Sequence, residues 1–138
     1  MKFLMVVISL CFSLLSHAQT EKASVYRYRC FQVTSYTGPE ATGPWLDRDF
    51  LVVIDLAKKK IHTYTGKEED IDLTDKTSTE NNDPDIITLH LEGIDQEGKH
   101  VLVTVYVFKH STSYHVATLL LNFPKEGFTL GLRLKNTD

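Results

Sequence analysis

Short runs of β-prone residues follow one another along most of the chain, and a turn signal separates each run from the next. The runs cover residues 24–36, 48–56, 61–65, 70–74, 86–92, 101–108, 114–123 and 128–135. In the run 86–92, Ile87, Leu89 and Leu91 alternate with polar residues, which is the period of a half-buried strand. No amphipathic helical pattern appears outside the N-terminus. The sequence therefore predicts an all-β protein with seven to eight strands.

The short connections between these runs favour antiparallel neighbours. A single sheet would leave its apolar face in water, so an antiparallel meander should form either a small barrel or a two-sheet sandwich. The apolar face of the run 24–36 changes side after Cys30, which indicates a β-bulge there. Residues 75–85 are polar throughout and indicate an exposed loop. The run 101–108 is apolar on both faces, which favours a position covered from both sides.

The N-terminus carries the pattern of a cleaved export signal. Lys2 supplies a positive charge, residues 3–15 are mostly apolar, and small residues precede a cleavage point after Ala18. We expect residues 1–18 to be a signal peptide and residues 19–138 to be a single secreted β domain. Retention of the segment as an anchor helix is the alternative. The pattern leaves open whether export ends in a periplasm, on a cell surface or outside the cell.

Charge and cysteine content narrow the class of protein further. The chain has 15 Lys and Arg residues and 18 Asp and Glu residues, and loss of Lys2 with the signal peptide leaves a net charge of −4. This balance excludes a strongly basic nucleic-acid binder, since phosphate contacts need clustered Lys and Arg. A charged fraction of 24% beside a hydrophobic fraction of 42% argues against a disordered chain. Cys30 is the only cysteine after the signal peptide, so an internal disulfide is excluded and the core has to hold the fold.

No motif of a known catalytic or metal site stands out in the sequence. A nucleophile elbow, a phosphate-binding glycine loop and a metalloprotease helix are all missing. The five histidines after residue 18 show no local ligand pairing, and the acidic stretch 68–75 lacks the glycine and the distal glutamate of a calcium loop. We therefore expect no metal and no cofactor, assign no catalytic residue, and favour a protein that is not an enzyme.

Alternating aromatic and basic residues near the start of the domain form the best candidate for a binding surface. Tyr26 and Tyr28 should share one face of their strand, and Arg27 and Arg29 the other. Tyr and Arg are enriched among the residues that dominate binding interfaces, and arginine pairs bidentately with carboxylates. The alternative is an exposed strand whose arginines pair with nearby acids. Trp45, the only tryptophan, joins the candidate set as either a cap on a barrel end or a contact anchor.

Trp45 also belongs to a short motif, Gly43-Pro44-Trp45, that resembles the G-x-W motif of lipocalins. The resemblance implies a closed eight-stranded barrel that holds a ligand, so a lipocalin-like barrel is one form that the predicted meander could take. It covers three residues only. The lipocalin motif opens the first strand, whereas here the run 24–36 precedes it, and the later Thr-Asp and Tyr signature is missing. We therefore assign no family on this resemblance.

These observations leave three classes of function. The first is a secreted or periplasmic β domain without enzymatic activity that binds a protein partner, as an inhibitor, an immunity-type protein or an envelope accessory. The second is a carrier that holds a small apolar molecule inside a barrel, although a small barrel filled by its own side chains leaves little room. The third is an enzyme of unknown class. The sequence decides neither the partner or ligand nor the oligomeric state.

Overall fold

The computed structural model of the chain describes residues 25–37, 43–66, 68–81 and 83–137. The predicted signal peptide and part of the Gly-Pro loop lie outside these residues. Within the described ranges, no helix is long and apolar enough to cross a lipid bilayer.

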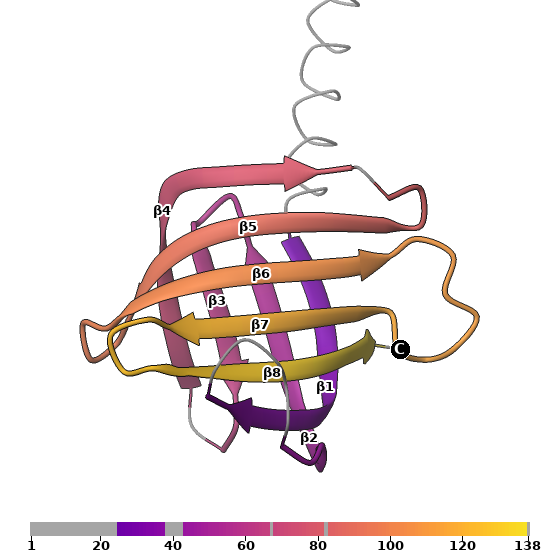
Figure 1. Cartoon of the computed structure of the whole chain (residues 1–138), viewed down its shortest axis with the longest axis horizontal. Coiled ribbons are helices and arrows are strands. Elements are labelled where there is room, and N and C mark those ends of the chain that lie inside the picture. The colour runs from indigo at the N-terminus through magenta and orange to yellow at the C-terminus, as the bar shows by residue number, and fades with distance from the viewer. Residues whose placement is uncertain (1–24, 38–42, 67, 82, 138) are drawn as a thin grey trace, which may run out of the picture.

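Eight antiparallel strands form a closed barrel. The strands are β1 (Val25–Tyr36), β2 (Leu46–Asp55), β3 (Lys60–Tyr64), β4 (Glu68–Glu80), β5 (Ile86–Asp95), β6 (His100–Phe108), β7 (Ala117–Phe123) and β8 (Phe128–Asn136). Each strand pairs with the next one along the chain, and β8 pairs with β1 to close the ring (Figure 1). The predicted all-β meander is confirmed, and of the two predicted architectures the barrel is the one that forms.

The barrel is flattened into two layers of strands that cross each other (Figure 1). Strands β5 to β8 form the front layer in this view, β2 and β3 lie behind it, and β1 and β4 bend so that each belongs to both layers. Each bend coincides with a shift in register, between Cys30 and Gln32 in β1 and between Leu73 and Thr77 in β4. Bulges of this kind let a strand turn a corner while it keeps its partners. The bulge predicted near Cys30 is confirmed.

The second bend corrects the prediction for residues 75–85. The polar composition of this segment predicts an exposed loop, but β4 continues through Glu80, and the pairing runs from Thr77 with Leu91 to Glu80 with Thr88. The paired residues from Thr77 to Glu80 are all exposed, so the segment needs no apolar pattern of its own. Backbone hydrogen bonds to β5 hold the segment in a strand instead, and the composition of the segment does not indicate them.

Gly93 on β5 allows the close approach of β4 and β5 at this corner. A Cβ atom at this position would lie 2.6 Å from the Ile71 Cγ2 atom and 2.8 Å from the Asp72 main-chain oxygen. Both distances are shorter than van der Waals contact, so no side chain fits without displacing β4. The glycine therefore permits the tight packing of the bent β4 against its neighbour.

Alternate residues of each strand fill the interior of the barrel. On β6, Val101, Val103 and Val105 face inward and are at most 2% exposed, whereas Leu102 faces outward and is 37% exposed. The expectation that this strand is covered on both faces is therefore wrong, because a closed barrel gives every strand one inner and one outer face. The largest fully buried side chains are Ile54, Ile61, Leu119, Leu134, Val52, Val101, Val103 and Cys30.

Cys30 lies in this core, at the bulge of β1. It is fully buried, and its Sγ atom donates a hydrogen bond to the main-chain oxygen of Gln32 over 3.3 Å. Burial raises the pKa of the Cys30 thiol to about 12, so the thiol stays protonated at neutral pH. Because the thiolate is the nucleophilic form, Cys30 is a small apolar core residue and not a reactive group.

We therefore expect Cys30 in the folded protein to resist alkylation by iodoacetamide at neutral pH. Peptide mapping by mass spectrometry should find this residue unmodified after incubation of the native protein, and modified after the same incubation in guanidinium chloride. The unfolded sample is the control for the activity of the reagent. Rapid modification of Cys30 in the native sample would contradict the inert role given to its thiol.

Candidate functional site

The barrel is filled at its waist and hollow at both ends. We name the end at the β3–β4, β5–β6 and β7–β8 connections the lower mouth, and the opposite end, where β1 begins and β8 ends, the upper mouth. The lower mouth holds a hollow of about 440 Å³, and one of about 160 Å³ adjoins it through shared lining residues. The upper mouth holds a hollow of about 280 Å³. The larger hollow falls in the range of small-molecule sites, roughly 300–1,000 Å³.

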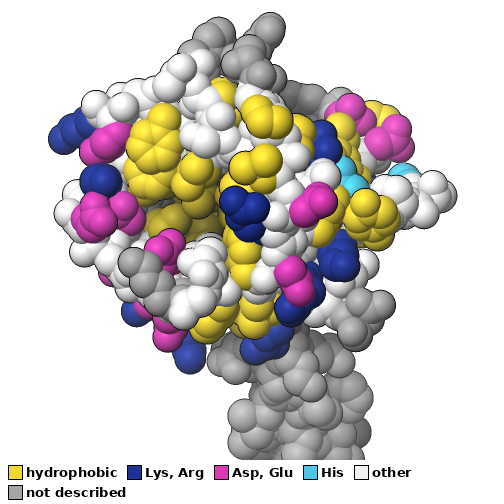
Figure 2. Space-filling model, turned by 90° about the horizontal axis from the view of Figure 1, so that it is seen from below, with side chains coloured by type: hydrophobic (Ala, Val, Ile, Leu, Met, Phe, Trp, Pro, Cys, Tyr) yellow, Lys and Arg dark blue, Asp and Glu magenta, His cyan; other side chains and the backbone are white. Residues whose placement is uncertain are grey.

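The lower mouth combines an apolar floor with a charged rim. The apolar side chains include Phe50, Leu121 and Leu130, which come from inward positions of β2, β7 and β8. Figure 2 shows hydrophobic side chains lining a hollow on this side of the molecule, with acidic and basic groups at its border. The full lining of the larger hollow is Val33, Arg48, Asp49, Phe50, Thr63, Tyr64, Thr65, Gly66, Glu69, Leu121, Leu130 and Leu132.

Arg48 carries the only positive charge among the described residues that line the larger hollow. Its Nη1 group donates a hydrogen bond to the main-chain oxygen of Asp47 over 2.7 Å, and its guanidinium has no acidic partner within the described part of the chain. In contrast, Arg29 on the outer wall pairs with Asp49, and the hydrogen bond from Arg29 lowers the pKa of that carboxyl group. The Arg48 guanidinium therefore keeps donors for an anionic group that enters the mouth.

The upper mouth is almost entirely apolar. Tyr28 is 8% exposed there, and burial, together with the neighbouring Tyr26, raises the pKa of its phenol. A hollow of this kind offers van der Waals contact but few polar groups that would orient a ligand. The lower mouth is the stronger candidate site for that reason. The lining of the upper hollow is Tyr26, Tyr28, Ile54, Leu56, Thr79, Ile87, Leu89, Val105 and Val107.

The structure divides the predicted tyrosine and arginine residues between the inside and the outside of the barrel. Tyr26 and Tyr28 line the upper mouth. Arg27 is exposed, and the half-buried Arg29 pairs with Asp49. The two faces of the strand alternate as predicted, so the four residues do not form one continuous patch. Their role in binding stays a prediction.

Trp45 packs against the outer wall of β8. The guanidinium carbon of Arg133 lies 4.0 Å from the centroid of the indole ring, and the tip of the ring lies over Gly131. Arg133 also donates a hydrogen bond from Nη1 to the Gln32 side-chain oxygen over 2.9 Å. This cation–π contact attaches the residues before β2 to the place where β1 and β8 close the barrel. Trp45 therefore has a partner within its own chain, and its predicted role as a contact anchor is untested.

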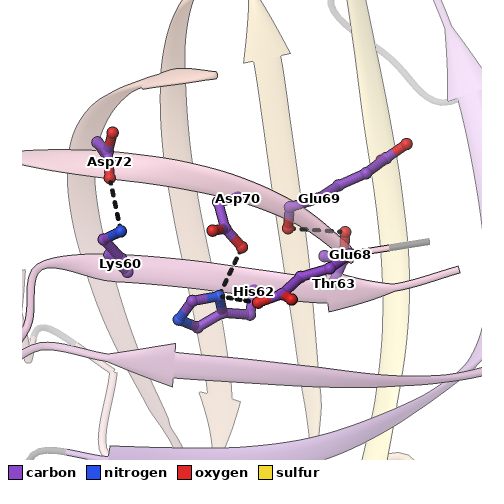
Figure 3. Close-up of polar contacts among 7 residues, drawn as sticks. All are labelled: Lys60, His62, Thr63, Glu68, Glu69, Asp70 and Asp72. Carbon is purple, nitrogen blue, oxygen red and sulfur yellow. Dashed lines mark hydrogen bonds and ion pairs between the residues drawn. The ribbon is translucent and has the colours of Figure 1, made fainter. Parts of the chain in front are cut away.

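Sequence reasoning missed one group of polar side chains on the outer wall of the β3–β4 hairpin (Figure 3). The Nδ1 atom of His62 lies 2.5 Å from Asp70 Oδ1 and 3.4 Å from Glu68 Oε1. Beside this group, Lys60 Nζ lies 3.6 Å from Asp72 Oδ1. The hairpin register sets His62 opposite Asp70 and Lys60 opposite Asp72. These pairs could have been predicted from the sequence, because residues at equal distances on either side of the β3–β4 turn lie opposite each other in a hairpin.

A cluster of rings covers the outer wall beside the β6–β7 connection. The His115 ring centroid lies 5.7 Å from that of Phe31 and 5.1 Å from that of Phe108. Its Nε2 atom is 2.8 Å from Thr118 Oγ1. Burial, and then the nearby charge of Arg133, lower the pKa of His115 below 6.5. The neutral imidazole is therefore the form that this cluster favours.

The lowered pKa of His115 predicts a loss of stability in mild acid. In the unfolded chain His115 binds a proton near pH 6.5, whereas in the folded chain it does so only at lower pH. The free energy of unfolding should therefore be highest above pH 6.5 and should fall as the pH drops from there toward the pKa of the folded state. In urea unfolding at about pH 7.5 and about pH 5, His115→Gln should show a smaller drop than the unchanged protein. Thr112→Ala, which changes an exposed residue without a titratable group in the same connection, should keep the full drop. Equal drops in all three proteins would contradict this role of His115.

Comparisons of the chain with protein-family models, with curated proteins and with solved structures found no match.

Proposed function

We propose that the protein is a non-enzymatic β-barrel that binds a small amphipathic molecule in its lower mouth. The apolar part of the ligand lies on the floor of the hollow, and an anionic head lies at the rim. The observation that carries this proposal is the hollow of about 440 Å³ between an apolar floor and Arg48. The export pattern at the N-terminus extends the proposal to a barrel that acts in a periplasm or outside the cell.

The floor of the hollow supplies most of the binding free energy in this proposal. Phe50 and Leu130 are only partly buried in the free protein, so an entering alkyl or aryl group would remove their remaining exposed surface from water. Each square ångström of apolar surface removed from water contributes about 25 cal/mol. Both side chains lie on paired strands, so the site is already formed before a ligand enters. Binding therefore loses little conformational entropy of the protein.

The rim of the hollow orients the ligand. Arg48 offers donors for a carboxylate, a sulfonate or a phosphate, whereas Glu69, which lines the same hollow, repels these groups. An anionic head is therefore favoured on the Arg48 side of the mouth and disfavoured on the Glu69 side. The small apolar ligand of the second function class in the sequence analysis would contact the same floor but would have no preference for the Arg48 side.

Calorimetric titration of the purified protein with decanoate, decanol and decylamine tests this proposal. We expect decanoate to bind most tightly, because its chain covers the floor and its carboxylate pairs with Arg48. Arg48→Gln should remove the preference for decanoate over decanol and leave binding of the chain. Leu130→Trp should weaken binding of all three compounds by about tenfold or more, because the indole would fill the hollow.

Two further variants serve as controls for the position of the ligand. Arg27→Gln changes an exposed arginine outside the lower mouth and should leave all three affinities unchanged. Val107→Trp fills the upper mouth instead and should also leave them unchanged. The proposal is wrong if none of the compounds shows saturable binding, or if Val107→Trp abolishes binding and Leu130→Trp does not.

A protein partner is the second candidate, and the exposed end of β1 favours it. Tyr26 is 44% exposed at the upper mouth, and the neighbouring Arg27 is exposed and has no acidic partner among the described residues. Tyr and Arg are the residue types that most often dominate protein interfaces. A partner with an acidic patch around an apolar anchor would suit this pair, because the anchor would enter the apolar hollow beside Tyr26.

Capture of a partner from an envelope extract by the immobilised protein tests the second candidate. Arg27→Glu should abolish the capture, because it places a negative charge against the acidic patch. Lys125→Glu makes the same charge change on the exposed β7–β8 turn and should leave the capture intact. Equal capture by both variants would show that the end of β1 is not the contact surface.

A further inference from the structure

The group around His62 differs from the other histidine contacts in the described part of the chain. His90 lies 3.3 Å from Glu80, and His100 lies 3.5 Å from the Glu92 carboxylate. At His62 two carboxylates converge on one imidazole, and one donor atom from each of the three residues lies within 4.8 Å of the others. It is the only group of three or more potential metal ligands among the described residues.

The backbone of the β3–β4 hairpin holds this group together. His62 and Asp70 are opposite each other in the strand register, and Glu68 is opposite Tyr64. The Tyr64 ring stacks against the His62 ring, with centroids 6.2 Å apart and planes 29° apart. The His62 and Asp70 side chains are 19% and 24% exposed, so two of the three ligands stand partly shielded from water. The hairpin therefore preorganises the ligands before any ion arrives.

Among the residues whose side chains are described, none of the Lys and Arg ion pairs involves Glu68 or Asp70. Lys60, on the same strand as His62, lies next to Asp72, one pair farther along the ladder (Figure 3). The Glu68 and Asp70 carboxylates both contact the same nitrogen of His62, Nδ1. A divalent cation beside this nitrogen would be attracted by both carboxylates.

The distances suit a small transition-metal ion. A tetrahedral ion with bonds of about 2.0–2.2 Å has neighbouring ligand atoms roughly 3.3–3.6 Å apart. The His62 Nδ1 to Glu68 Oε1 distance of 3.4 Å meets this requirement. The His62 Nδ1 to Asp70 Oδ1 distance of 2.5 Å is that of a hydrogen bond, and it would lengthen when the ion replaces the shared proton.

We propose that His62, Glu68 and Asp70 form a binding site for a divalent transition-metal ion of the Zn²⁺ class on the outer wall of the barrel. One nitrogen and two carboxylate oxygens suit Zn²⁺, whereas Ca²⁺ and Mg²⁺ take oxygen ligands almost exclusively. Three protein ligands leave the fourth tetrahedral position for water or for a donor from another molecule. Bound metal would link β3 to β4 and stabilise the folded state, because the unfolded chain does not hold the three ligands together.

Calorimetric titration of the untagged protein with Zn²⁺ tests this site. We expect one saturable site per chain, and a melting temperature that rises when Zn²⁺ is added. His62→Ala should weaken binding by at least about tenfold, the lower bound seen when groups that only support a metal ligand are removed. Glu68→Gln changes a side chain that is 56% exposed, so the variant should fold normally and still lose affinity.

A matched control separates the site from weak binding to surface histidines. His90→Ala removes a histidine that contacts Glu80 and should leave Zn²⁺ affinity unchanged. A large excess of Ca²⁺ should not displace Zn²⁺. The proposal is wrong if Zn²⁺ shows no saturable binding, if His62→Ala and Glu68→Gln bind as well as the unchanged protein, or if Ca²⁺ competes on equal terms.

Discussion

Backbone pairing between β1 and β8 closes the sheet, and the other features of the structure depend on that closure. The pairing runs from Tyr28 opposite Asn136 to Tyr36 opposite Thr129, on both sides of the β1 bulge. Closure removes the exposed edges that an open sheet would present. In this flattened barrel the two layers cross, so β1 and β4 bend where they pass from one layer to the other. The bulge after Cys30 supplies one bend and returns Val33 to the inner face, opposite Leu132.

The same closure explains why the barrel is filled at its waist and hollow at its ends. Eight strands leave an interior just wide enough for their own side chains. At the waist, inward residues such as Ile61, Leu119 and Leu134 meet and exclude space for a ligand. Toward each mouth the opposing side chains separate, and hollows of about 440 Å³ and 280 Å³ remain. The lower mouth differs from the upper one because polar residues, Arg48 among them, stand at the strand ends that form its rim.

Much less of the candidate sites than of the fold could be predicted from the sequence. Alternation placed Tyr28 and Arg29 on opposite faces of their strand, but it gave no indication that the tyrosine lines a hollow. The larger hollow takes Arg48 from β2, Glu69 from β4 and Leu130 from β8, so its residues are neighbours only after the ring has closed. In contrast, His62, Glu68 and Asp70 lie within one hairpin, so the strand register on either side of the β3–β4 turn would have been enough to predict that they lie close together.

The amino-acid sequence by itself determined the class of the fold, most of the strands and the inner face of several of them, such as 86–92 and 128–135. These depend on a period of two residues, which is a local property of a strand. Only the tertiary structure decided that the meander closes, that β4 extends to Glu80 and that Trp45 packs beneath Arg133. Each of these features depends on a partner distant in the chain, as when Cys30 pairs with Leu134. A local pattern indicates which face of a strand is apolar, but the packing of the whole barrel determines which strand lies beside it.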